Sequence, residues 1–154
     1  MKDIIGSKIA DILGINQDGN EMKLTDFKGK KIILYFYPKD NTPGCTAQAC
    51  SLRDNFAELQ QKGYEVVGVS ADSIASHKKF IAKHELPFHL IADTNHELAN
   101  AFGTWGEKTL YGKKHLGMFR TTFIINEEGI VESIITPKEV KTKEHGLQLL
   151  DIIK

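Results

Sequence analysis

The chain has 154 residues, of which 41% are hydrophobic and 26% are charged. This length predicts a single domain over residues 1–154, and the composition is that of a globular protein rather than a disordered one. Twenty Lys and Arg residues balance 20 Asp and Glu residues, which argues against nucleic acid or an anionic membrane surface as the partner.

Hydropathy gives no sign of a membrane protein. The longest apolar run, residues 32–37, is far shorter than the ~18 residues of a membrane-spanning helix. Asp3 and Asp11 interrupt the apolar core that a signal peptide needs, so we expect a cytoplasmic protein. Two cysteines, Cys45 and Cys50, are too few for a secreted disulfide framework, and in a reducing compartment such a pair more often binds metal or carries out redox chemistry.

The first half of the chain predicts a β-α-β unit. Turn residues at 17–20 indicate a hairpin near the N-terminus. Residues 31–37 form an uninterrupted β-branched and aromatic run, typical of a strand buried on both faces, and Pro38 ends it. Apolar residues then recur at helical spacing over 45–60, and residues 65–70 predict the next strand.

The second half predicts more helices and strands. A helix is expected over 74–83 and a strand over 88–92. Residues 121–126 and 130–135 indicate a hairpin, and Leu147, Leu150 and Ile153 give the apolar stripe of a C-terminal helix. The predicted fold is α/β, a three-layer sandwich whose central mixed sheet is flanked by helices.

The segment 37–50 is where we expect chemistry. It reads Tyr-Pro-Lys-Asp-Asn-Thr-Pro-Gly-Cys-Thr-Ala-Gln-Ala-Cys, leaves the buried strand, turns and opens the helix. Thr42 is suited to the N-cap and Pro43 to the first helical position, which places Cys45 in the first turn. Unpaired N–H groups and the helix dipole stabilise an anion there, and the thiolate is the nucleophilic form of cysteine.

Two other uses of the cysteines remain open at this point. Zinc could bind Cys45 and Cys50 together with His84 and His89, but the two pairs lie much further apart in the chain than in a zinc finger. We expect five histidines at the solvated surface: His77, His84, His96, His115 and His145. A thioredoxin-type dithiol would need Cys-x-x-Cys. On an ideal helix the Cα atoms of Cys45 and Cys50 lie about 8.6 Å apart, which exceeds the roughly 7 Å that a disulfide tolerates.

The pattern Pro38-x-x-x-Thr42-x-x-Cys45 resembles the active-site motif of the peroxiredoxins. Residues 35–40, 42–46, 49–50 and 52–54 are similar to the bacterioferritin-comigratory (Q-type) subgroup, and further similar stretches are 24–30, 67–70, 91–93 and 117–125. The resemblance implies a thioredoxin-like fold and a monomer without haem, flavin or metal.

The resemblance also implies roles for individual residues. Cys45 corresponds to the peroxidatic cysteine and Cys50 to the resolving cysteine. Thr42 corresponds to the hydroxyl partner, Arg120 to the active-site guanidinium and Pro38 to a residue that shields the pocket. Donors to the substrate would include the Gly44 and Cys45 amides.

The implied function is reduction of hydrogen peroxide and organic hydroperoxides through a Cys45 sulfenic acid and a Cys45–Cys50 disulfide, with recycling by thioredoxin or a glutaredoxin-like protein. This would serve antioxidant defence and redox homeostasis. The alternatives are a thiol-disulfide oxidoreductase and a redox-sensing interaction protein.

The sequence departs from the family pattern at two places. The segment 9–13 looks like the opening strand of the family but lacks its usual proline, and Gln48 stands where many relatives carry Glu. Trp105 lies in a stretch, 102–108, that matches a family loop, and we expect it in the core or in a pocket wall.

Overall fold

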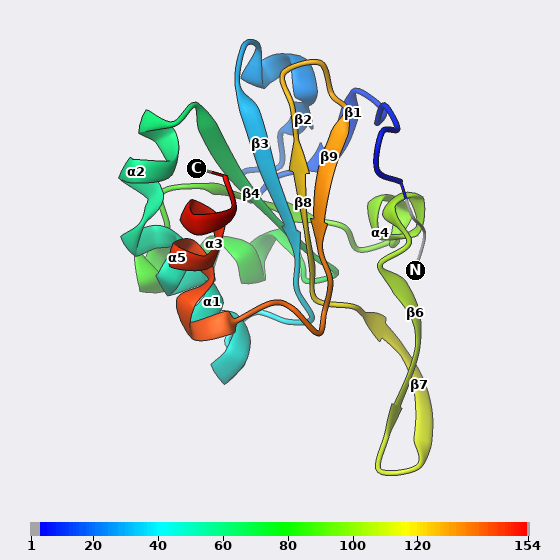
Figure 1. Cartoon of the computed structure of the whole chain (residues 1–154). Coiled ribbons are helices and arrows are strands. Elements are labelled where there is room, and N and C mark those ends of the chain that lie inside the picture. Colours follow the sequence, from blue (N-terminus) through cyan, green and yellow to red (C-terminus); the bar gives the residue numbers. More distant parts are fainter. Residues whose placement is uncertain (1–3, 154) are drawn as a thin grey trace.

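The computed structural model describes residues 4–153 and has a five-stranded mixed sheet at its centre (Figure 1). Its strands are β3 (Lys31–Phe36), β4 (Tyr64–Ser70), β5 (His89–Ala92), β8 (Thr121–Ile125) and β9 (Val131–Ile135). They lie in the order β5-β4-β3-β8-β9, with β3, β4 and β5 parallel and the remaining two pairings antiparallel. The predicted mixed sheet and its C-terminal hairpin are confirmed.

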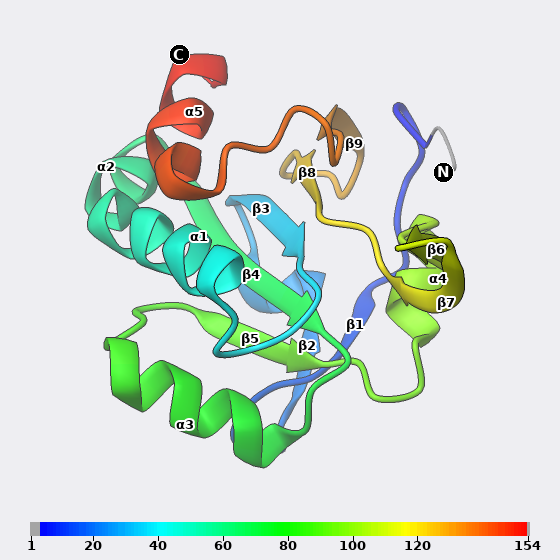
Figure 2. The same ribbon diagram turned by 90° about the horizontal axis from the view of Figure 1, so that it is seen from below.

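Four helices cover one face of this sheet (Figure 2). They are α1 (Pro43–Asp54), α2 (Phe56–Gln61), α3 (Ile74–His84) and α5 (His145–Ile152), and a short 3-10 turn, Thr142–Glu144, precedes α5. Ile33 and Tyr35 of β3 pack there with Leu52, Phe80 and Leu149 from the helices. The side chains of β3 alternate between faces, so this core holds its odd-numbered residues.

The opposite face is covered by smaller elements. They are the hairpin of β1 (Ile12–Ile15) and β2 (Glu21–Lys23), a 3-10 turn at Leu24–Phe27, and α4 (Glu97–Phe102). Leu34 and Phe36 pack there with Leu13 and Phe102. The N-terminal hairpin is confirmed, although its first strand begins three residues later than the expected segment 9–13.

A second hairpin, β6 (Trp105–Leu110) and β7 (Lys113–Met118), extends from the body of the molecule (Figure 1). The sequence did not predict it. Its strands are mostly exposed and pair only with each other, so the alternation that marks a half-buried strand is missing. Its turn also places Tyr111 at φ 52° and Gly112 at φ 76°, and a tyrosine is an unusual residue for that position.

The helix expected over 45–60 is interrupted at Asn55. The Asn55 side chain donates to the carbonyl of Ser51 at 2.8 Å, competing with the backbone for that acceptor. Gly146 of α5 lies against this point, because an added Cβ would be 2.5 Å from the Ser51 carbonyl oxygen. The break therefore accommodates the close approach of α5.

Within residues 4–153, no helix has the length and apolar character needed to cross a membrane.

Candidate active site

Cys45 lies at the start of the helix that follows the central strand. Thr42 is the N-cap residue and Pro43 the first helical residue, as the sequence predicted. Helix geometry leaves the N–H groups of Gly44 and Cys45 without an intrahelical acceptor. The Cys45 side chain is 1% exposed, and both cysteines are free thiols.

Arg120 connects the end of the β7–β8 link to this first turn. Its Nη2 donates to Cys45 Sγ at 3.2 Å, and its Nη1 donates to Gln48 Oε1 at 2.6 Å. A Cβ on Gly44 would lie 3.4 Å from Nη2, an ordinary van der Waals distance, so the guanidinium packs directly against this residue. The structure thus brings Arg120 and Cys45 together.

Two buried polar groups beside Cys45 are unpaired. The Gln48 amide nitrogen and the Tyr35 hydroxyl have no hydrogen-bond partner within residues 4–153. Burial raises the pKa of Tyr35 well above its ordinary value of 10.0, and the charges of Asp40 and Cys45 act in the same direction. Tyr35 is therefore a neutral phenol, able to donate a hydrogen bond.

Lys108 of β6 brings a second cation to the site. Burial lowers the pKa of Lys108, the charge of Arg120 lowers it further, and Cys45 opposes both effects. Since Gln48 is neutral, the groups that contact or face the Cys45 sulfur include two cations, and Arg120 has no carboxylate among its contacts in residues 4–153. This arrangement stabilises a thiolate.

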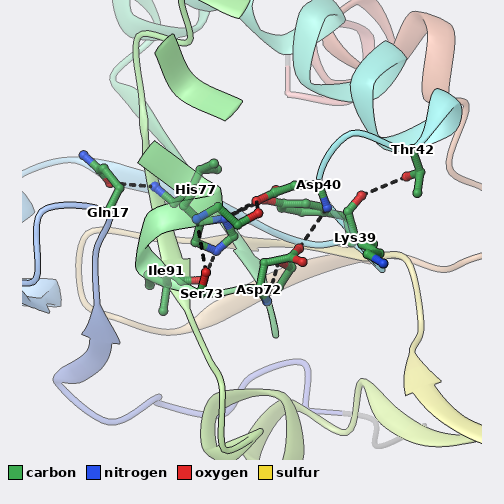
Figure 3. Close-up of polar contacts among 12 residues, drawn as sticks. Gln17, Lys39, Asp40, Thr42, Asp72, Ser73, His77 and Ile91 are labelled. Carbon is green, nitrogen blue, oxygen red and sulfur yellow. Dashed lines mark hydrogen bonds and ion pairs between the residues drawn. The ribbon is translucent and has the colours of Figure 1, made fainter. Parts of the chain in front are cut away.

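Thr42 and Pro38 lie in the loop before the helix. The Thr42 hydroxyl donates to the Lys39 carbonyl at 2.8 Å rather than to Cys45, and its oxygen accepts no capping hydrogen bond from the N–H groups of the helix (Figure 3). Its oxygen stays available as an acceptor only. Pro38 is half-buried where the loop leaves the sheet.

A buried network that the sequence did not predict fixes this loop (Figure 3). The Asp40 carboxylate accepts from Tyr37 Oη at 2.6 Å and from Ser76 Oγ at 2.8 Å, and lies 2.7 Å from His77 Nδ1. His77 Nε2 lies 2.9 Å from the Ile91 carbonyl, which only accepts, so Nε2 carries a proton and a second proton lies between Nδ1 and Asp40. The expectation that His77 is a surface residue is wrong, because its exposure is 0%.

The same network contains a group with metal-ligand geometry. Ligand atoms of Asp40, Asp72 and His77 lie within 4.8 Å of one another, the one such cluster that the described part of the chain contains. Asp72 Oδ2 already accepts from the Asp40 amide and from Ser70 Oγ, and Asp40 already has three hydrogen-bond contacts. These oxygens therefore hold the loop in place. The zinc ligands considered from the sequence, Cys45 and Cys50 with His84 and His89, form no such cluster within residues 4–153.

The second cysteine has separate surroundings. Cys50 is half-buried, and its Sγ lies 3.9 Å from His84 Nδ1. Arg53 Nη1 donates to the His84 carbonyl at 2.8 Å. The sequence predicts His84 as a surface residue, whereas it is half-buried at the end of α3, against α1.

The remaining histidines divide between core and surface. His145 was expected at the surface, but its exposure is 0%, and burial lowers its pKa to about 4. It lies 2.8 Å from Thr122 Oγ1 and 2.9 Å from Gln148 Oε1. His115 is exposed as expected, and His96 stacks on Trp105 at 3.7 Å between ring centroids. Trp105 is half-buried against the core, in agreement with its expected place.

A groove of about 480 Å³ lies between β1 and α4. Leu13, Leu98 and Phe102 line it and belong to the core on the opposite face of the sheet from Cys45. The groove is thus separate from the thiol site.

Comparison with known proteins places this geometry in context. The model of the AhpC/TSA family matches residues 5–134. Peroxiredoxin Bcp of Bacillus subtilis is 44% identical over 150 residues, which cover 97% of this chain and 94% of that protein. Among solved structures, peroxiredoxin Q of Xanthomonas campestris superposes with a TM-score of 0.83 at 35% identity, covering 90% of this chain and 87% of that one. A structural study of the bacterioferritin comigratory protein from the same organism, 34% identical with a TM-score of 0.83 and the same coverage, concerns its alkyl peroxide reduction activity.

Proposed function

Since the chain belongs to the AhpC/TSA family and is a thiol peroxidase of the Bcp or Q-type peroxiredoxin group, we propose that Cys45 is its nucleophile and Cys50 its resolving cysteine. The observation that supports this most strongly is the 3.2 Å contact from Arg120 Nη2 to Cys45 Sγ in the first turn of α1. A fixed guanidinium and two free N–H groups stabilise the charge that the reaction needs.

The first step is attack on the peroxide. The Cys45 thiolate bonds to the terminal oxygen of ROOH, the O–O bond breaks, and the alkoxide takes a proton and leaves as ROH. Cys45 becomes a sulfenic acid. Arg120 and the Gly44 and Cys45 amides donate to the charge that develops on the oxygens, while Pro38 shields the pocket and the Thr42 oxygen accepts from the peroxide hydroxyl.

The second step joins the two cysteines. Cys50 attacks the Cys45 sulfur, the S–O bond breaks and water leaves, so a disulfide forms. The ideal-helix separation of about 8.6 Å is too long for that bond, so the first turns of α1 must unwind before it forms. A thiol reductant then restores both thiols.

The same chemistry supports a proposal for the substrates, the reductant and the setting of the reaction. We propose hydrogen peroxide and organic hydroperoxides as substrates and thioredoxin, or a glutaredoxin-like protein, as the reductant. The protein acts as a cytoplasmic, single-domain monomer in antioxidant defence. Sulfur carries every electron pair in this cycle, so the cycle requires no haem, flavin or metal.

The test is peroxide consumption coupled to thioredoxin, its reductase and NADPH. Cys45→Ser should abolish turnover, because a serine hydroxyl provides no accessible anion. Cys50→Ser should consume one peroxide per chain, stall with thioredoxin, and resume when a small thiol is added. Retained turnover in Cys45→Ser would overturn the proposal.

The same assay separates the alternatives. A thiol-disulfide oxidoreductase would reduce insulin disulfides efficiently without peroxide. A redox sensor would be oxidised once by peroxide, with no steady turnover in the presence of the reductant.

A further inference from the structure

Cys50 lacks the features that stabilise a thiolate at Cys45. It lies in the body of α1 (Pro43–Asp54), away from the free N–H groups of the first turn. Its sulfur contacts a histidine, whereas the Cys45 sulfur contacts a guanidinium. A resolving thiol must nevertheless lose its proton, because the thiolate is the attacking form.

The histidine that contacts Cys50 is placed to receive that proton. Nδ1 of His84 lies 3.9 Å from Cys50 Sγ, within the range of a sulfur hydrogen bond. His84 is the last residue of α3, so its imidazole lies against Cys50 from the C-terminal end of that helix.

Two contacts hold the His84 ring beside the sulfur. Arg53 Nη1 donates to the His84 carbonyl at 2.8 Å, which links α1 to the end of α3. The Phe80 ring meets the imidazole edge to face, with centroids 5.1 Å apart and planes at 75°. The pair is therefore part of the packing between α1 and α3.

We propose that His84 is a catalytic residue that accepts the proton of Cys50 during disulfide formation, an inference that rests on the proposed resolving role of Cys50. Nδ1 takes the proton from Sγ as the Cys50 sulfur attacks the Cys45 sulfenic acid. The S–O bond breaks, the departing hydroxide takes that proton from His84 and leaves as water, and the ring returns to its neutral form. Arg53 is a positioning residue that also places a cation near the thiolate.

The titratable and charged groups near this pair come from α1, from β3 and from the residue that follows α3. On α1, Arg53 interacts electrostatically with Cys50, and Asp54 lies 3.0 Å from its Nε. Glu85, directly after α3, also interacts with Arg53, and the Tyr35 hydroxyl of β3 faces Cys50 from the sheet. Asp54 and Glu85 interact with Arg53, whereas the side chain within hydrogen-bond range of the sulfur in residues 4–153 is His84, which makes His84 the proton acceptor at Sγ.

The direct test uses Cys45→Ser, in which Cys50 is the only thiol. Alkylation of Cys50 by iodoacetamide is followed from pH 6 to pH 10 with His84 present and in His84→Asn, whose amide oxygen can accept a hydrogen bond but does not take up a proton. We expect alkylation about fivefold to tenfold slower in His84→Asn at pH 7, and equal rates at pH 10, where a thiol ionises unaided. His115→Asn, on the exposed β7, is the matched control and should leave the rate unchanged.

Either of two results overturns the inference. Equal rates at pH 7 would show that His84 takes no proton from Cys50. The same loss at pH 7 and at pH 10 would show that the substitution alters only access to the sulfur.

A single turnover of the protein with both cysteines separates the inference from the proposed function. In His84→Asn, sulfenic acid formation should keep its rate while disulfide formation slows about tenfold at pH 7. If disulfide formation keeps its rate, the inference fails and the resolving role of Cys50 stands. If the parent protein forms no Cys45–Cys50 disulfide, the resolving role itself fails, whatever the alkylation shows.

Discussion

The two halves of α1 are held to the rest of the protein by different contacts. The first half carries Cys45 and Gln48, and one side chain, Arg120, donates to both. The second half is linked to two other helices: Arg53 donates to the end of α3, and the Gly146 amide of α5 donates to Ser51 Oγ at 2.9 Å.

This difference indicates which cysteine moves. The loop before α1 is fixed by Asp40, and the second half of the helix is fixed by α3 and α5. In the turns between them, Cys45 and Gln48 are hydrogen-bonded by one guanidinium, and oxidation of Cys45 removes the thiolate that this guanidinium contacts. We therefore expect Cys45 to move toward Cys50 while Cys50 stays beside His84.

The largest expected effect comes from removing the Asp40 carboxylate, which fixes the loop before α1. Asp40→Ala leaves His77 buried without its carboxylate, and removing one partner of a buried pair costs about 3–5 kcal/mol in free energy of unfolding. Urea unfolding measures this cost. Asp18→Ala, in an exposed pair 3.9 Å from Lys78, is the control and should change stability by less than about 0.5 kcal/mol. A cost below about 1 kcal/mol for Asp40→Ala would show that the network does not fix the loop.

The next effect concerns the guanidinium that serves the first half of the helix. Arg120→Ala should lower the rate constant for reaction with peroxide by about 10²–10³-fold, because it removes donors aimed at the developing charge. Stopped-flow Trp105 fluorescence follows this reaction. Arg120→Lys keeps the charge without the paired donors and should give an intermediate rate. An unchanged rate in Arg120→Ala would remove Arg120 from the mechanism.

The third prediction concerns His145 of α5, the helix that contacts the second half of α1, and is tested by a pH titration. His145 is buried as a neutral ring with its pKa lowered to about 4, so the unfolded chain binds its proton first as the pH falls. Stability from this residue is complete above pH 6.5 and decreases toward pH 4, by about 3 kcal/mol in all. Between pH 6.5 and pH 4, the free energy of unfolding should therefore fall by about 3 kcal/mol less in His145→Gln than in the parent protein. Identical pH dependence in both proteins would contradict the prediction.

The smallest expected effect tests the contact between α5 and α1. Gly146→Ala places a Cβ 2.5 Å from the Ser51 carbonyl oxygen, so the helices must separate at a cost of about 1–3 kcal/mol in free energy of unfolding. Leu147→Ala, at the exposed neighbouring position, is the control. Equal stability of the two variants in urea unfolding would show that the contact is not tight.

Local sequence patterns predicted much of the fold and the position of Cys45 at the start of α1. The run before Pro38 predicted the central strand because it is apolar at consecutive positions, as a strand buried on both faces requires. Thr42 and Pro43 located the helix start because their preferences are local. The placement of Cys45 in the first turn followed from these two signals.

Contacts between distant residues could not be predicted in this way. Arg120 lies 75 residues from Cys45 in the chain, and only the family resemblance assigned it to the site. The sequence predicts His77 and His145 at the surface, because the partners that allow a histidine to be buried come from other elements. Those partners are Asp40 for His77 and Thr122 for His145. The pair of Cys50 and His84 also depends on the packing of α1 against α3.

Hydrogen exchange of the reduced and disulfide forms tests the difference between the two halves of α1 most directly. We predict that amide protection is lost in the disulfide form at residues 46–50, which donate to the carbonyls of residues 42–46, while residues 52–54, which donate to residues 48–50, and the strands of the central sheet keep theirs. Equal protection in the two forms, or a loss that extends through Asp54, would contradict the account, because the second half of α1 would then not be the fixed part.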